Sequence, residues 1–285
     1  MAYVLEDEFG DIIGKARHGL GLSVEETAAA AGLSAPDLRA LEAYEHAPTE
    51  TENRRLAEAL QLEPAALWSI ATEHWQPVSS ATELEGGARL VLLPYPPMRV
   101  TMYVLGDTAS NQALIVDPGA EPQRILAALS REGWQAVGIL ITHADGDHIG
   151  ALADVWQASL VPVWVHADER PRLRGVDAAH LHSFDRDVEF ALGPFVIRAL
   201  ETAGHAAGHT AYALRDAVFV GDTLFAGSVG RTSLGPEHYQ AHLAAVRAQI
   251  LSLPAATRLF PGHGPPTTVG EERVNNPFFA ARDRA

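Results

Sequence analysis

Two histidines and two aspartates lie within six consecutive positions of the chain, namely His143, Asp145, Asp147 and His148. They follow a short apolar run, residues 137–141, that is typical of a buried strand. Loops at strand ends commonly carry the functional residues of α/β proteins. Imidazole nitrogens and carboxylate oxygens that converge are common ligands of divalent metal ions. We therefore interpret this segment as part of a metal site. The alternative, a solvated acidic loop, predicts no further ligands elsewhere in the chain.

Three later segments each place candidate ligands at the end of a β-type run and beside a glycine. These candidates are His205 with His209, then Asp222, and finally His263. Each would be an ordinary turn residue if it stood alone, but together they form an ordered series that chance explains poorly. The chain contains no cysteine, which excludes disulfides, thiolate metal sites and thiol nucleophiles. Any metal must therefore be held by histidine, aspartate or glutamate.

The overall composition restricts the partners of the chain. Its 285 residues have an ordinary apolar share of 47% and a formal net charge of -15 at pH 7. This negative charge disfavours non-specific binding to nucleic acid. The sequence has no apolar run long enough to span a bilayer and no basic or apolar signal region at its start. We therefore predict a cytoplasmic protein without a membrane partner.

The N-terminal part, residues 1–75, is predicted to be entirely helical. Ser23 and Glu26 form a capping box that starts one helix, and Gly32 ends it before the next helix begins. The resulting helix-turn-helix pattern resembles the Cro/CI-type domains of bacterial regulators, which implies DNA binding. However, residues 1–72 carry thirteen acidic and only five basic side chains, whereas groove-reading modules need a basic footprint. The alternative is a small helical unit used for homodimerisation or for covering the catalytic part.

The rest of the chain divides into a linker and a mixed part that must position the ligands. Residues 76–87 contain proline, serine and glycine and are predicted to be a linker. Residues 88–285 contain short β-type runs punctuated by helical segments, one of them predicted at residues 168–173. This pattern predicts a layered α/β domain with two sheets and helices outside them.

The ordered series of ligand segments resembles the metallo-β-lactamase fold superfamily and, within it, the glyoxalase II-like hydrolases. The resemblance covers the chain from about residue 88 onward. The motifs that carry it are Asp117-Pro118-Gly119, Thr142-His143-x-Asp145-x-Asp147-His148-x-Gly150, Gly204-His205-x-x-Gly208-His209-Thr210, Gly221-Asp222-Thr223-Leu224-Phe225, Gly230-Arg231-Thr232 and Pro261-Gly262-His263-Gly264. It implies an αββα sandwich with two metals at one edge of the sheets.

The resemblance also implies a role for each motif residue. The ligands of the first metal would be His143, Asp145 and His205, those of the second Asp147, His148 and His263, with Asp222 bridging both. Asp117 and His209 match positions that support the ligands without binding metal. The remaining histidines match no motif and are predicted to be surface or core residues, namely His18, His46, His74, His166, His180, His182, His238 and His242.

Asp145 departs from the family pattern, which usually has histidine at this position. A carboxylate is a harder ligand than imidazole, and it shifts the preference from zinc toward manganese or iron. We predict two divalent ions, which could be zinc, manganese or iron, with Asp145 favouring manganese or iron. The alternative is that Asp145 binds poorly and that the first metal is weakly held or absent.

The resemblance implies hydrolysis by a hydroxide that bridges the two metals. A metal lowers the pKa of bound water toward ~7, so no separate protein base is required. The predicted catalytic residues are Asp222, which bridges the metals, and Asp147, which can hold or relay a proton. The predicted substrate is a small anionic or ester-type molecule, either an ester, a thioester or a phosphodiester. We predict a structural ion pair for Arg231, with substrate contact as the alternative, and place residues 94–98 at the mouth of the site.

Two other functions remain open at this point. A persulfide dioxygenase-like oxidoreductase would use a mononuclear iron site of His143, His205 and Asp222, although that family typically has cysteine where Ser228 stands. A DNA-binding regulator would use the metal-binding part as a sensor. Metal content and oxygen consumption separate the first alternative from the hydrolase. Salt-dependent DNA binding tests the second.

Overall fold

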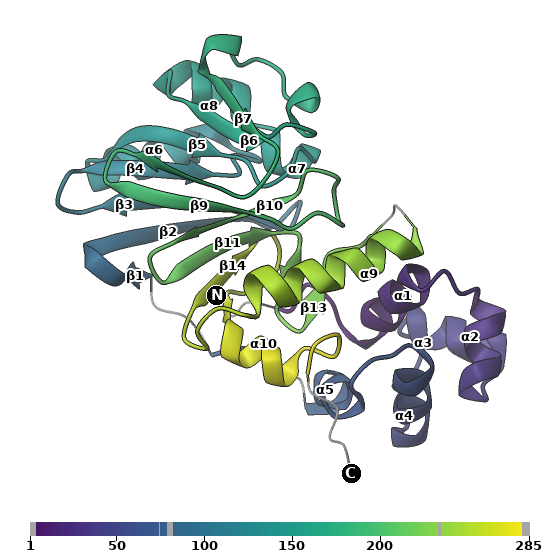
Figure 1. Ribbon diagram of the computed structural model, residues 1–285. Coiled ribbons are helices and arrows are strands. Elements are labelled where there is room, and N and C mark those ends of the chain that lie inside the picture. The colour runs from purple at the N-terminus through teal and green to yellow at the C-terminus, as the bar shows by residue number, and fades with distance from the viewer. Residues whose placement is uncertain (1–3, 74, 79–81, 233–234, 281–285) are drawn as a thin grey trace.

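The structure, a computed structural model, describes residues 4–73, 75–78, 82–232 and 235–280 and contains two facing β-sheets (Figure 1). The strands of the first sheet are, in spatial order, β1 (Glu83–Leu84), β2 (Ala88–Tyr95), β3 (Val100–Asp107), β4 (Gln112–Val116), β5 (Gln135–Leu140), β6 (Val163–His166) and β7 (Leu181–Phe184). Those of the second are β15 (Thr267–Thr268), β14 (Arg258–Pro261), β11 (Ala217–Gly221), β10 (Thr210–Leu214), β9 (Phe195–Glu201) and β8 (Val188–Leu192). A separate hairpin pairs β12 (Leu224–Phe225) with β13 (Ser228–Val229).

Helices flank both sheets. The N-terminal part contains α1 (Phe9–Gly19), α2 (Val24–Ala31), α3 (Ala35–Glu42), α4 (Glu50–Ala59), α5 (Pro64–Trp68) and the π-helical turn η1 (Ser69–Glu73). The later helices are α6 (Pro122–Glu132), α7 (Gly146–Ile149), α8 (Leu152–Ser159), α9 (Pro236–Ala245), the π-helical turn η5 (Val246–Ile250) and α10 (Val269–Asn275). Three 3-10 turns are η2 (Glu85–Gly87), η3 (Arg170–Arg172) and η4 (Ala178–His180). Figure 1 shows α6 and α8 outside the first sheet, with α9 and α10 outside the second.

The four layers are held together by three apolar clusters. One cluster lies between the first sheet and its helices and includes Val104, Ile125 of α6 and Val155 of α8. A second fills the space between the sheets and includes Tyr103 and Phe219. Every residue of β3 is buried because both faces of this strand are covered. The third cluster covers the outer face of the second sheet. This mixed sandwich agrees with the layering expected from the sequence.

The strand directions bring the ligand segments to one edge of the sandwich. β5 ends at Leu140, directly before the first ligand segment. In the second sheet, β11 pairs in parallel with β14, so the segments after Gly221 and Pro261 leave the sheet at the same end. β10 runs antiparallel to β11 and begins at Thr210, which places the preceding loop at that end too. The four segments therefore meet because of sheet topology.

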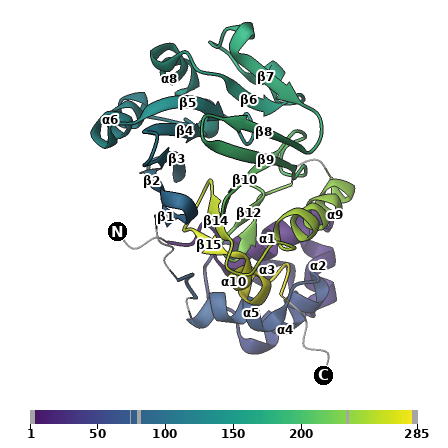
Figure 2. The ribbon, with the colours of Figure 1, turned by 60° about the vertical axis from the view of Figure 1, so that its left-hand side comes forward.

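The N-terminal helices share the third apolar cluster with the second sheet. Ile12 of α1 and Leu56 of α4 are completely buried in the same cluster as Val220 of β11 and Val246 of η5. Helix α1 contacts α9, and α5 contacts α10. Figure 2 shows α1 to α5 side by side with α9 and α10. Packing is thus continuous across the predicted boundary at residue 75, and the helices cover the second sheet.

Local sequence signals explain how these helices begin and end. The hydroxyl of Ser23 accepts a hydrogen bond from the amide of Glu26 at 3.1 Å, and the carboxylate of Glu26 accepts one from the amide of Ser23 at 2.8 Å. Gly32 ends α2 with a φ of 65°, a conformation that glycine adopts without penalty.

On α3, Arg39 is ion-paired with Glu25 at 2.5 Å. The likeness to Cro/CI-type domains stays a prediction.

Two local predictions need correction. Residues 168–173 were expected to be a helix, but they form only the turn η3, because Pro171 lacks an amide hydrogen and Glu169 points inward to the ligand loops. The stretch predicted to be a linker contains β1, which pairs with β2 because the side chain of Leu84 is buried between the sheets. Within the described ranges, the structure has no helix whose length and apolar character would let it cross a membrane.

Candidate metal centre

All seven residues predicted to bind metal lie together at the edge where the four ligand segments meet. Their atoms form three overlapping groups, in each of which the potential ligand atoms lie within 4.8 Å of one another. The groups are His143 with Asp145 and His205, Asp147 with His148 and His263, and His143 with His148 and Asp222. We call the first group the first triad and the second group the second triad. Asp147 and His148 lie on the short helix α7.

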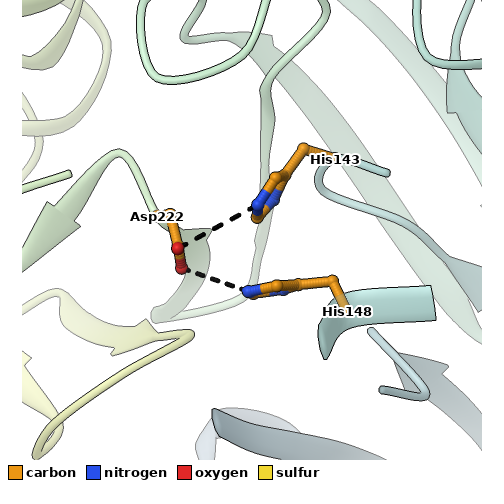
Figure 3. A group of neighbouring side chains, drawn as sticks. All are labelled: His143, His148 and Asp222. Carbon is orange, nitrogen blue, oxygen red and sulfur yellow. Dashed lines mark ion pairs between the residues drawn. The ribbon is translucent and has the colours of Figure 1, made fainter. Parts of the chain in front are cut away.

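Asp222 lies between the two triads. Its Oδ2 is 4.0 Å from Nε2 of His143, 3.8 Å from Nε2 of His205 and 3.4 Å from Nε2 of His263. Its Oδ1 is 3.2 Å from Nε2 of His148. Figure 3 shows the carboxylate of Asp222 facing His143 and His148. One carboxylate thus faces histidines of both triads, which is the position that a bridging ligand requires.

The four histidines of the triads share one orientation. In each, Nδ1 lies against an oxygen of the protein, and Nε2 is turned toward the centre. The Nδ1 partners are the hydroxyl of Thr142 for His143 at 3.1 Å, the carboxylate of Asp117 for His148 at 2.9 Å, the carbonyl of Arg231 for His205 at 2.8 Å and the carbonyl of Arg99 for His263 at 3.1 Å. An Nδ1–H that donates to such an oxygen leaves Nε2 with a free lone pair for a metal.

Several atoms at the centre have no protein partner. Among the described residues, Nε2 of His143, His148 and His205 and Oδ1 of Asp222 are buried and form no hydrogen bond. Leaving buried polar atoms unsatisfied costs free energy, so such atoms require an explanation. Gly262 explains how they come so close, because a Cβ there would stand 2.4 Å from Oδ1 of Asp222 and 2.5 Å from a ring carbon of His148. The donor set fits divalent metal ions.

The charges of the centre are strongly coupled. Burial lowers the pKa of His263, but hydrogen bonds to Asp147 and Asp222 outweigh it and raise the pKa to about 9. For Asp222, burial acts in the opposite direction and would raise the pKa, but the attraction between Asp222 and His148 holds the pKa of Asp222 well below its usual range. Burial and the neighbouring His148 instead lower the pKa of His143. The carboxylates are thus ionised, as metal ligands must be, and protons compete with metal for His263.

The two residues predicted to support the ligands contact them directly. Asp117 accepts hydrogen bonds from the amide of Thr142 at 2.8 Å, from its hydroxyl at 2.7 Å and from His148. His209 accepts one from the amide of Asp222 at 3.1 Å through Nε2, while its Nδ1 donates to the hydroxyl of Thr202 at 2.9 Å. Burial lowers the pKa of His209, which agrees with this neutral form.

Three residues that contact the ligand loops were not predicted from the sequence. Glu169 is buried and accepts hydrogen bonds from the amides of Ala144 at 3.0 Å and Gly208 at 3.1 Å, so it ties the first and second ligand segments together. Arg172 lies 3.0 Å from Glu169 and 2.6 Å from Oδ1 of Asp145. The only sequence signal for this pair is the spacing of opposite charges three residues apart, which is too common to be specific.

His242 is the third residue that the sequence did not single out. Burial lowers its pKa to about 4. Its neutral ring donates through Nε2 to the carbonyl of Thr223 at 2.8 Å and accepts through Nδ1 from the hydroxyl of Thr232 at 3.0 Å. It therefore fixes the chain on both sides of the segment that follows Asp222. The sequence predicted a surface or core residue, and the structure places it in the core, but its contacts with the ligand segment could not be inferred from the sequence.

Arg231, residues 94–98 and Ser228 lie near the predicted ligands, and the structure shows how each is placed. Arg231 contributes its backbone carbonyl to His205, and its side chain is exposed, with no ion pair to any described residue. Pro94, Tyr95 and Pro96 line a pocket near His263, and the prediction that residues 94–98 form the mouth of the metal site stays a prediction. The hydroxyl of Ser228 is buried and forms no hydrogen bond with the described residues.

The fold and the arrangement of ligands define a metallo-β-lactamase-type metal site, and the chain belongs to the metallo-beta-lactamase superfamily, which it matches over residues 95–263. It is 35% identical over 203 residues to the probable metallo-hydrolase YqgX of Bacillus subtilis (strain 168), covering 66% of this chain and 95% of that protein. It is 39% identical over 166 residues to a hydroxyacylglutathione hydrolase of Rhodopseudomonas palustris (strain BisA53), covering 56% of this chain and 61% of that protein.

A solved structure gives a further comparison. The crystal structure of TTHA1623 in a di-iron-bound form matches with a TM-score of 0.52 and 30% sequence identity, covering 72% of this chain and 100% of that one. The comparisons thus support a metal-dependent hydrolase with glyoxalase II-like relatives. They give no support to DNA binding by the N-terminal helices.

Proposed function

We propose that the protein is a dinuclear metal-dependent hydrolase that cleaves an ester, a thioester or a phosphodiester. The observation that carries this proposal is the position of Asp222, whose two oxygens face histidines of both triads. A single ion would leave the donors of one triad without a partner, and for the buried histidines among them this costs free energy. The di-iron form of TTHA1623 and the metallo-hydrolase relatives support the same reading.

Each residue of the centre has a defined task in this proposal. The first triad would hold one ion and the second triad the other, and Asp222, which faces histidines of both triads, would be a ligand to each. Two divalent ions at such a site supply Lewis acidity and lower the pKa of water, which provides a nucleophile at neutral pH. Asp145 supplies a carboxylate where the family usually has imidazole, and this favours manganese or iron over zinc.

Asp147 is the residue best placed to move a proton. Its side chain is a quarter exposed, and its Oδ2 lies 3.2 Å from Nε2 of His263. The contact with His263 lowers the pKa of Asp147, so the carboxylate is ionised at neutral pH and can accept a proton. No serine nucleophile is required, because water with a pKa lowered by the metal ions would supply the nucleophile, and the chain contains no cysteine.

Elemental analysis of protein purified without added metal tests the proposal. We expect about two ions per chain in the wild type and a loss of both in Asp222→Ala, since this ligand contacts both triads and must be ionised to bind. Asp154→Ala, which removes an exposed aspartate of α8, is the matched control and should keep both ions. A wild-type content near one ion, together with oxygen consumption on a persulfide, would refute the dinuclear hydrolase.

A further inference from the structure

A pocket with a volume of about 590 Å³ lies near His263 and is lined by none of the seven predicted metal ligands. Its walls connect to His263 at two points, because the carbonyl of Arg99 lies 3.1 Å from Nδ1 of His263 and Gly264 follows it in the chain. The size is within the range of small-molecule sites. Its apolar lining residues are Val4, Leu92, Pro94, Tyr95, Pro96 and Val100. Its size and lining therefore suit a small apolar group, and it lies on the Nδ1 side of His263.

The N-terminal part contributes one wall of this pocket through Val4 and Glu6. Arg99, in the loop between β2 and β3, holds this segment in place. One of its terminal nitrogens donates to the carbonyls of Leu5 at 3.2 Å and Glu6 at 3.1 Å, and its Nε lies 3.2 Å from the carboxylate of Glu6. The same residue thus touches both the N-terminal segment and His263.

Helix α1 reinforces this attachment. Lys15 pairs with Asp7 and donates to the carbonyl of Val229 at 2.9 Å. Its ammonium also lies 4.8 Å from the centre of the Phe225 ring, which in turn meets the ring of His263 edge-on at 5.7 Å. Because α1 also belongs to the shared apolar cluster, the N-terminal wall is fixed relative to the metal centre.

The charges around the pocket narrow the kind of group that it can hold. Both arginines that line it are already ion-paired, Arg99 with Glu6 at 3.2 Å and Arg124 with Glu121 at 2.5 Å. Paired charges attract an anion much less than a free cation does. The net charge of -15 adds a general repulsion of anions. The apolar lining therefore favours an uncharged group.

We propose that the N-terminal helical unit supplies a substrate-pocket wall, and that this pocket holds the uncharged apolar acyl arm of an ester or thioester. This inference rests on the proposed hydrolase function and specifies its substrate class. The superfamily match begins only at residue 95, so these helices lie outside the matched part of the chain. It gives the unit a role that does not require DNA.

The test combines hydrolysis and binding. We measure hydrolysis by the metal-loaded protein of four p-nitrophenyl esters, the acetate, butyrate, hexanoate and octanoate. A lactoyl thioester of glutathione is measured for comparison. We expect kcat/KM to rise with acyl length and to be lower for the anionic glutathione thioester than for the octanoate. Val4→Trp, which fills the pocket from the N-terminal wall, should lower kcat/KM for the octanoate about tenfold more than for the acetate. Val274→Trp changes a similarly exposed valine on α10 and should match the wild type.

Binding of octanamide, an uncharged ligand, separates this inference from the hydrolase proposal. Calorimetry should show binding to the wild type and to Val274→Trp, and loss of binding in Val4→Trp. An acyl-length profile or an octanamide affinity that Val4→Trp leaves unchanged would overturn the inference even if ester hydrolysis persists. If no ester is hydrolysed but octanamide binding depends on Val4, the pocket stands and the proposed reaction fails. A preference for the glutathione thioester over every apolar ester would also overturn the inference.

Discussion

The two triads of the metal centre contain the same kinds of ligand but differ in what surrounds their aspartates. The side chain of Asp145 in the first triad is 42% exposed, and its carboxylate forms an ion pair with Arg172. The side chain of Asp147 in the second triad is 25% exposed and lies against His263, a ligand of the same triad. The second triad also contains His148, whose orientation is fixed by the buried carboxylate of Asp117.

This difference teaches that the two halves are not equally prepared for a metal. In the first triad, hydrogen bonding to His205 and the ion pair with Arg172 hold the pKa of Asp145 well below its usual range. The cation of Arg172 also competes with a metal ion for this carboxylate. In the second triad, Asp147 is paired instead with His263, which is itself a predicted ligand of that triad. We therefore expect the second triad to bind its ion more tightly than the first.

Removing each aspartate in turn tests this comparison most directly. Asp145→Ala and Asp147→Ala should each lower the metal content from about two ions to about one, because each triad loses an ionised ligand. The ion that remains in Asp145→Ala should be held at least about tenfold more tightly than the ion that remains in Asp147→Ala. Dialysis against a graded series of chelator concentrations measures this. Equal retention in the two variants would show that the triads are equivalent.

Weakening the support of the second triad should give a smaller effect. Asp117→Asn keeps the shape of the side chain and its φ of 48°, but it removes the charged acceptor that orients His148. Changes to such supporting residues typically cost about 10- to 100-fold in metal affinity. Titration of the second site by calorimetry checks this value. Asp107→Asn, a buried aspartate at the other end of the first sheet, is the control and should leave the affinity intact.

Removing the competitor in the first triad should give the smallest effect and the opposite sign. Arg172→Gln deletes the cation 2.6 Å from Asp145, so the first site should bind manganese up to about tenfold more tightly. Arg170 lies on the same turn, η3, and donates a hydrogen bond to Ser183 of β7. Its replacement in Arg170→Gln should not alter the affinity of the first site for manganese. Competition titrations with a metal-sensitive dye measure both variants. A weaker first site in Arg172→Gln would mean that the arginine positions Asp145 for the metal.

The sequence was informative where the signal is local. The ligand segments follow apolar runs and contain glycines, so their place at strand ends could be predicted from local sequence. Their convergence at one edge was implied by the ordered series of motifs and the family resemblance. Capping by Ser23 and Glu26 could be predicted for the same reason. Whether the predicted residues bind metal as assigned is tested by the experiments above.

The sequence was uninformative where contacts depend on the tertiary arrangement. Arg172 meets Asp145 across 27 positions of the chain, and Arg99 meets Glu6 across 93. Neither pair has a motif, because a surface-type arginine and an acidic residue have no preferred spacing when they lie on different elements. The short edge strands β1 and β7 were missed for a related reason, since each is stabilised mainly by its neighbour in the sheet.

The apolar cluster that joins α1 and α4 to β11 and η5 has a thermodynamic consequence for the whole molecule. Elements that bury one another's surface lose their stability together, so the helical unit and the second sheet form one cooperative folding block. Ions or substrate that bind the folded state therefore also stabilise the folded form of helices that contact neither of them. We therefore expect occupancy of the centre to oppose the opening of α2 and α4 that occurs through joint unfolding of this block.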